Sequence, residues 1–131
     1  MATDGFVGIY IETRNYGATA AFWESLGFVN DIETDHLSGQ WTHPNGGPYV
    51  FIAERQGTEP LVTYPMLWVK DSTAFSPSRP LDYVEEFRPE HWGVMAAIAR
   101  DPDGRPVGFQ APLPDGVTAP GMDEHHAQTY G

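Results

Sequence analysis

The chain has 131 residues, enough to close one hydrophobic core and too few for two ordinary domains. Its 18 Asp and Glu against 7 Lys and Arg give a formal net charge of −11, which repels nucleic-acid phosphates and anionic lipid, so neither is an expected partner. No apolar run approaches a membrane span, the first residues lack the pattern of a signal peptide, and cysteine is absent, so the expected location is the cytoplasm.

The first half of the chain predicts one strand, one helix and three further strands. Asn15 can cap the helix, and Gly27 can end it in the left-handed conformation. Ala18, Phe22 and Leu26 recur at helical spacing, which predicts that they form the buried stripe of this helix. The expected bounds of the five elements are 6–12, 16–26, 28–34, 37–42 and 48–54.

The second half predicts the same order with a damaged helix. Asp71 can cap this helix, but Pro77 and Pro80 leave room for only a turn or two, since a proline inside a helix costs about 3 kcal/mol. The expected strands are 62–70, 81–87, 92–100 and 105–111. We therefore expect the second helix to be shortened.

An internal repeat supports this division into halves. Residues 43–53 align with residues 101–111, 58 positions later, and share Pro, Gly, Pro, Phe and Ala at five of eleven positions. Each copy reads as a turn that leads into a strand, the last hairpin of its half. We expect residues 1–131 to be a single domain, with a first module at about 5–54, a linker at 55–60, a second module at about 61–111 and a tail at 112–131. The tail is expected to be loosely ordered or laid across a partner subunit.

Three motifs stand out: AFWESLGF at 21–28, LWVKD at 67–71, and Trp92-Gly93 followed by RDPDG at 100–104. Together they resemble the vicinal oxygen chelate superfamily, which includes glyoxalase I, dioxygenases, fosfomycin resistance enzymes and bleomycin resistance proteins. Residues 22–23, 49–53 and 66–69 look most like the bleomycin-resistance branch. The resemblance implies an α+β fold in which two tandem βαβββ modules form a mixed sheet that curls into a cup, often completed by a second subunit.

The resemblance also implies where a metal would bind in metal-dependent members. Those four places fall on Gly8, Val50, Tyr64 and Gly108, and none is an ordinary ligand. No metal or other cofactor is therefore expected, and glyoxalase, dioxygenase and fosfomycin-transferase chemistry is disfavoured.

A different alignment leaves one alternative open. If the register is shifted by two residues, Glu12, Glu54 and Gln110 enter the cup as substitute oxygen ligands. Three oxygens without a histidine would favour a weak site for a hard cation.

Strand alternation predicts which side chains face the cup, because residues two apart share a face of a sheet. Val7, Ile9 and Ile11 are expected beneath the helix. Phe22, Trp23, Phe28, Phe51 and Phe109 are expected in the core. The expected ligand-binding residues are Tyr10, Glu12, Trp41, Ile52, Glu54, Tyr64, Met66, Trp68, Trp92 and Gln110.

An aromatic, lightly acidic cup is suited to binding planar or cationic molecules. The first hypothesis is a metal-free protein that sequesters a planar or cationic natural product, as in antibiotic resistance, at a homodimer interface. The alternative is a metal-independent enzyme that modifies a natural product with Glu12, Glu54 or His91 as acid–base groups. A metal-dependent lyase or dioxygenase is the least favoured. The identity of the ligand, turnover, exchange of modules between subunits and the role of the tail are left open.

Overall fold

The computed structural model describes residues 2–120, and the expected elements are all present in it. Residues 121–131, which include His125 and His126, lie outside the described residues, and so does that part of the predicted tail. Within residues 2–120 no helix has the length and apolar character needed to cross a membrane. The elements are β1 (Phe6–Thr13), α1 (Tyr16–Ser25), β2 (Val29–Glu33), β3 (Ser38–Thr42), β4 (Tyr49–Glu54), β5 (Thr63–Trp68), the 3₁₀ turn η1 (Ser72–Ala74), β6 (Asp82–Pro89), β7 (Val94–Arg100) and β8 (Pro106–Pro112).

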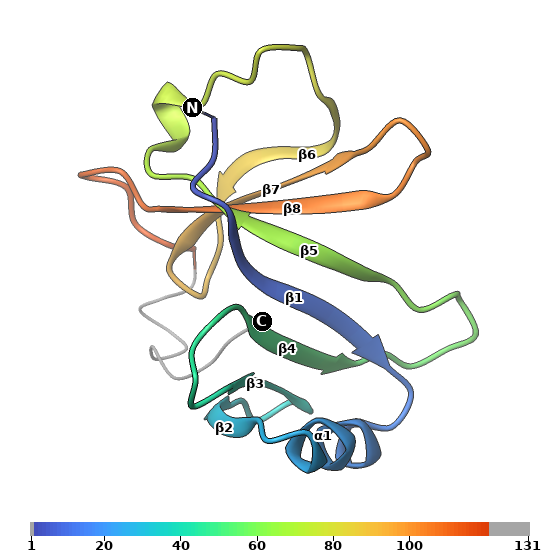
Figure 1. Ribbon diagram of the computed structural model, residues 1–131. Helices are drawn as coiled ribbons and strands as arrows, with labels where there is room; N and C mark the ends of the chain where they lie inside the picture. Colours follow the sequence, from blue (N-terminus) through green and yellow to red (C-terminus); the bar gives the residue numbers. More distant parts are fainter. Residues whose placement is uncertain (1, 121–131) are drawn as a thin grey trace.

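The eight strands form one mixed sheet in the order β2-β3-β4-β1-β5-β8-β7-β6. β1 pairs with β4 in parallel and β5 pairs with β8 in parallel, whereas β1 and β5 join the two halves in antiparallel fashion. Figure 1 shows these halves on either side of the β1–β5 pair, with α1 against the β2–β4 half. The predicted α+β fold of two tandem βαβββ modules is confirmed. The β1–β5 pair thus joins the two halves into one continuous sheet.

Local side chains explain where both helical segments begin. Asn15 Oδ1 accepts a hydrogen bond from the amide of Ala18 at 3.0 Å, as expected of a helix cap. Asp71 Oδ1 accepts from the amide of Thr73 at 2.9 Å, but the segment that it caps is only the three residues of η1. The two downstream prolines prevent a longer helix, so the shortened second helix is confirmed.

The predicted buried stripe of α1 is wrong. Phe22 and Leu26 are 58% and 52% exposed, whereas Tyr16 and Ala20 are buried against the sheet. Trp23 packs against the same cluster. Position 18 is offset from position 16 by two residues, or about 200° around the helix, so the expected stripe lies on the opposite face.

The two repeated turns differ in a way that the alignment of their sequences conceals. In both, a glycine amide closes the turn, from Gly46 to the carbonyl of His43 and from Gly104 to the carbonyl of Asp101, each at 2.9 Å. In the first turn a second glycine, Gly47, also has a positive φ of 93°. Arg105 stands at that place in the second turn. The chain therefore enters the two strands with a different phase.

As a result, the residues of β4 that face the core do not align with the residues of β8 that face the core. Val50 and Ile52 are buried beneath α1, whereas in β8 the buried core residues are Phe109 and Ala111. Residues at equivalent core-facing positions in the two strands are thus separated by an odd number of positions in the sequence, and not by the 58 positions of the alignment. A slip of one residue moves every side chain of a strand to the other face, so the expected cup-facing position of Val50 and Ile52 is wrong.

Candidate functional site

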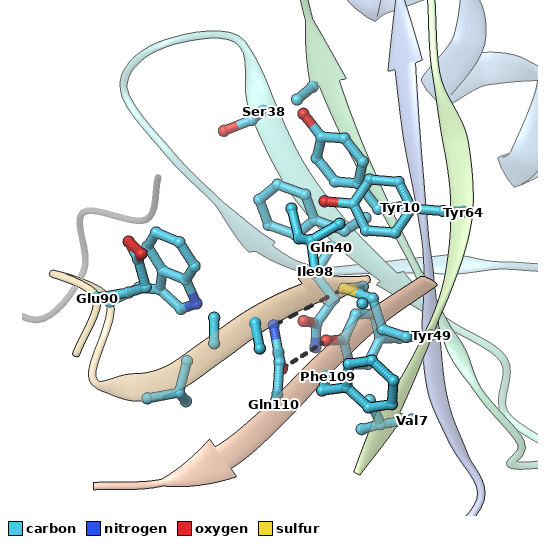
Figure 2. A pocket seen from close by; sticks show the side chains of 18 of the residues that line it. Val7, Tyr10, Ser38, Gln40, Tyr49, Tyr64, Glu90, Ile98, Phe109 and Gln110 are labelled. Carbon is cyan, nitrogen blue, oxygen red and sulfur yellow. Dashed lines mark hydrogen bonds between the residues drawn. The ribbon is translucent and has the colours of Figure 1, made fainter. Parts of the chain in front are cut away.

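A cavity of about 440 Å³ lies on the face of the sheet opposite α1, and both modules line it. Predicted ligand-binding residues that line it are Tyr10, Glu54, Tyr64, Met66, Trp68, Trp92 and Gln110. Further lining residues that the sequence analysis did not propose include Val7, His36, Ser38, Gln40, Tyr49, Phe51, Arg55, Glu85 and Glu90. Figure 2 shows several of these side chains gathered over the strands.

Trp41 and Ile52 do not line the cavity. They are 2% and 0% exposed and pack in the core under α1, where Trp41 Nε1 donates to Glu24 Oε2 at 3.1 Å. The side chains of β4 alternate one residue out of step with the expected pattern, so Tyr49 and Phe51 face the cavity in place of Ile52. Phe51 was expected in the core, and the extra glycine of the preceding turn is the signal that could have corrected both assignments.

A bulge accounts for another difference in β1. The pairing of β1 with β5 shifts between Phe6 and Gly8, and Val7 lines the cavity although it was expected beneath the helix. Ile11, beyond the bulge, packs on the core as expected. Phe6 is 67% exposed.

Tyrosine rings cover the centre of the sheet because two glycines leave room for them. A Cβ atom at Gly8 would lie 2.6 Å from Cδ1 of Tyr49, and one at Gly108 would lie 2.9 Å from Cε1 of Tyr64. Both separations are shorter than carbon atoms tolerate, so any side chain at these glycines would displace a ring. We call Tyr49, Tyr64, Met66 and Gln110 the floor of the cup.

The floor is linked across the two modules by hydrogen bonds. The Tyr49 hydroxyl on β4 donates to Gln110 Oε1 on β8 at 3.2 Å, and Gln110 Nε2 donates to Met66 Sδ at 3.8 Å. The dashed lines in Figure 2 mark these two bonds. Because β1 and β5 lie between β4 and β8, this chain of contacts spans the middle of the sheet.

Aromatic rings continue beside the floor. The ring centroids of Tyr10 and Tyr64 are 4.9 Å apart, and Tyr10 and Phe51 are stacked at 6.3 Å with an interplanar angle of 16°. Burial raises the pKa of Tyr10 to about 12 and also raises the pKa of Tyr64. Both phenols therefore remain neutral at physiological pH.

Glu12 is held at the edge of the cup and does not line the cavity. Its Oε2 accepts from the Tyr10 hydroxyl at 3.0 Å and from Arg55 Nε at 3.1 Å, and its Oε1 accepts from the amide of Val62 at 3.1 Å. These bonds hold the carboxylate away from the cavity that it was expected to enter. Arg55, which belongs to the predicted linker, lines the cavity instead.

The other two acid–base candidates differ in position. Glu54 lines the cavity, although its Oε1 accepts from the amide of Tyr16 at 2.9 Å and its Oε2 from Gln56 at 2.8 Å. His91 is not among the lining residues, and its ring packs edge-on against Trp92 with centroids 5.1 Å apart. Of the three candidates, only Glu54 is among the residues that line the cavity.

The residues at the centre of the cup do not fit a metal ion. Gly8 and Gly108 offer no side-chain donor, and the β4 residue that pairs with Gly8 is Tyr49, not Val50. Neutral phenols and glycines are poor ligands for a divalent cation. Within residues 2–120 no group of three or more His, Cys, Asp or Glu is placed to hold a metal.

The shifted register with substitute oxygen ligands is not supported either. Glu12 and Glu54 are each engaged by backbone amides and neighbouring side chains. Gln110 points to Tyr49 and Met66. The three groups therefore do not converge on one point as a cation site requires.

No protein-family model matches the chain, and no curated protein matches its sequence. Solved structures do match. Methylmalonyl-CoA epimerase from Mycobacterium tuberculosis is 13% identical with a TM-score of 0.66, and the match covers 86% of this chain and 91% of that one. A glyoxalase/bleomycin resistance protein/dioxygenase superfamily member from Vibrio splendidus 12B01 is 14% identical with a TM-score of 0.60, covering 81% and 97%. A glyoxalase I mutant from Zea mays is 17% identical with a TM-score of 0.57, covering 89% of this chain and 46% of that one. The chain therefore has the fold of the glyoxalase/bleomycin resistance protein/dioxygenase superfamily.

Proposed function

We propose that the protein binds a planar, cationic small molecule in the cup without a metal ion and sequesters it, as proteins of the bleomycin-resistance type do. The observation that carries this proposal is the floor of the cup. Where the family resemblance places metal ligands, tyrosine rings lie over glycines. The centre of the cavity is thus an aromatic surface and not a coordination site.

The dimensions of the cavity suit such a ligand. Its volume of about 440 Å³ falls within the range of roughly 300–1,000 Å³ that is usual for small-molecule sites. Tyr10, Phe51 and Tyr64 offer ring faces or edges, and Trp68 and Trp92 add indoles. Each ring contact contributes about 0.5–1.5 kcal/mol beyond burial, so two or three contacts favour a flat aromatic ligand strongly over a flexible one.

The charge of the lining favours a cation. Glu54, Glu85 and Glu90 are among the lining residues, against one arginine, Arg55. The carboxylates of Glu85 and Glu90 are each paired with Arg88. Arg55 is also paired with Glu12, which reduces its attraction for an anion. The net charge of −11 adds a field that draws cations to the protein.

A titration tests this proposal. The planar cation 9-aminoacridine should bind with saturation at one molecule per chain and quench tryptophan fluorescence. The planar anion 9-anthracenecarboxylate should bind at least tenfold more weakly. As a control, Phe22→Ala removes an exposed aromatic ring outside the cup and should leave both affinities unchanged. If neither compound binds, or if the anion binds better, the proposal is refuted.

The second candidate is a metal-independent enzyme, because Glu54, an acid–base candidate, is among the lining residues. An epimerase among the structural matches makes proton exchange at carbon the reaction to test. Deuterium incorporation from D₂O into methylmalonyl-CoA, abolished by Glu54→Gln, would support the enzyme. Sequestration predicts no incorporation.

We also propose that the chain acts as one domain within a homodimer. The eight-stranded sheet is continuous, but β2 and β6 are its end strands and each is paired on one side only in the described structure. Exposed strand edges favour association with another chain. Light scattering should give twice the chain mass of 14.5 kDa. A mass of one chain at micromolar concentration would refute the homodimer.

A further inference from the structure

Gln110 contributes a carboxamide to the floor of the cup, and its amide nitrogen has a weak hydrogen-bond acceptor as its partner. Gln110 Oε1 accepts a hydrogen bond from the Tyr49 hydroxyl, which fixes the orientation of the carboxamide. Gln110 Nε2 then points to Met66 Sδ at 3.8 Å. A thioether is a weak acceptor, so this N–H donor gains little from its contact.

Gln40 shows the contrast within the same cavity. Its Nε2 donates to a carboxylate oxygen of Asp31 at 2.9 Å, a short bond to a charged acceptor. Gln40 therefore already has one strong acceptor for its amide nitrogen. Gln110 is the glutamine whose hydrogen bonding a ligand can improve.

Small neighbours leave space beside the Gln110 carboxamide. Ala96 pairs with Gln110 across the β7–β8 ladder, and Gly108 precedes it on the same face of β8. Both residues also line the cavity, but the Tyr64 ring and Met66 cover Gly108. The approach to the amide nitrogen is therefore from the side of Ala96, where no bulky side chain has to move.

We propose that the ligand carries an uncharged hydrogen-bond acceptor, a carbonyl oxygen attached to its planar ring system, and that this oxygen accepts from Gln110 Nε2 in place of the Met66 sulfur. The inference rests on the proposed function and adds the chemical class of the ligand. An uncharged oxygen fits better than a carboxylate because Glu54, Glu85 and Glu90 line the same cavity. The planar rings beside the floor hold the rest of the ligand, and the amide sets its orientation.

A matched pair of probes isolates the carbonyl. 9-Fluorenone and fluorene are flat tricyclic molecules that differ only in a carbonyl in place of a methylene group. Equilibrium dialysis should show that the wild-type protein binds fluorenone roughly fivefold more tightly, the usual gain from one net hydrogen bond. Gln110→Met keeps the volume of the side chain but removes the donor, and the affinity ratio should fall to about one.

Two further variants keep the test decisive. Gln110→Glu retains an oxygen that can accept from the Tyr49 hydroxyl, and it removes the N–H. It should therefore also abolish the preference for fluorenone, and it provides the test if Gln110→Met does not fold. Gln40→Met removes the other glutamine of the cavity, and any change in affinity should affect both tricycles equally, so that the ratio persists.

The outcomes separate this inference from the proposed function. Equal binding of the two tricycles by the wild-type protein, or a preference that survives both Gln110 substitutions, overturns the role of Gln110 and leaves the planar site standing. Binding of 9-aminoacridine without binding of fluorenone also overturns it. If none of the three compounds binds, the proposed function fails and the inference fails with it.

Discussion

Replacing Gly8 with alanine tests the arrangement of the floor directly. The added Cβ would lie 2.6 Å from Cδ1 and 2.7 Å from Cζ of Tyr49. The ring must move away, and the Tyr49 hydroxyl then loses its position 3.2 Å from Gln110 Oε1. One methyl group on β1 should therefore disturb a contact between β4 and β8.

The magnitude follows from three contributions. Overpacking of a filled site costs about 1–3 kcal/mol. The lost hydrogen bond adds about 1 kcal/mol. Replacing glycine also lowers the conformational entropy of the unfolded chain, which stabilises the folded protein by about 0.4–1 kcal/mol. We expect a net loss of about 2 kcal/mol in the free energy of unfolding.

Gly17→Ala is the matched control, because it makes the same chemical change where there is space. A Cβ at Gly17 would meet only Asn15 Oδ1, at 3.8 Å. Within α1 this substitution should stabilise the protein by about 0.5–1 kcal/mol. Urea unfolding followed by tryptophan fluorescence gives both values. If Gly8→Ala is as stable as the wild type, Tyr49 does not lie over Gly8 and our account of the floor is refuted.

Three further variants test other parts of the structure. Trp68→Ala should weaken 9-aminoacridine binding more than tenfold in a fluorescence titration, with an unchanged far-UV circular dichroism spectrum; unchanged affinity would show that Trp68 is not in the binding face. Because burial raises the pKa of Tyr10 to about 12, the unfolded chain releases that proton at lower pH than the folded one, so stability falls as the pH rises from 10 to 12. Tyr10→Phe should make that decline shallower in urea titrations at several pH values, and an equal slope would contradict the burial of this phenol. Asn15→Ala should cost about 1 kcal/mol through loss of the bond to the Ala18 amide, measured by thermal unfolding, whereas no change would mean that the cap contributes nothing.

Much of the candidate site could be predicted from strand alternation alone where nothing interrupts a strand. Tyr64, Met66 and Trp68 follow each other on one face of β5, and all three line the cavity as expected. The method failed where the phase of the strand changes. The bulge in β1 and the second glycine before β4 each shift the faces by one residue, and neither leaves a hydrophobic pattern that reveals the new phase.

The order and type of the elements were determined by the sequence itself, because turns and caps depend on chemistry within a few residues. Asn15, Asp71 and the glycines of the two repeated turns each act on their immediate neighbours. The tertiary structure decided which side of each element is buried. The face of α1 that meets the sheet and the position of Tyr49 over Gly8 depend on partners about 17 to 41 residues away in the chain, and contacts over such distances leave no local trace.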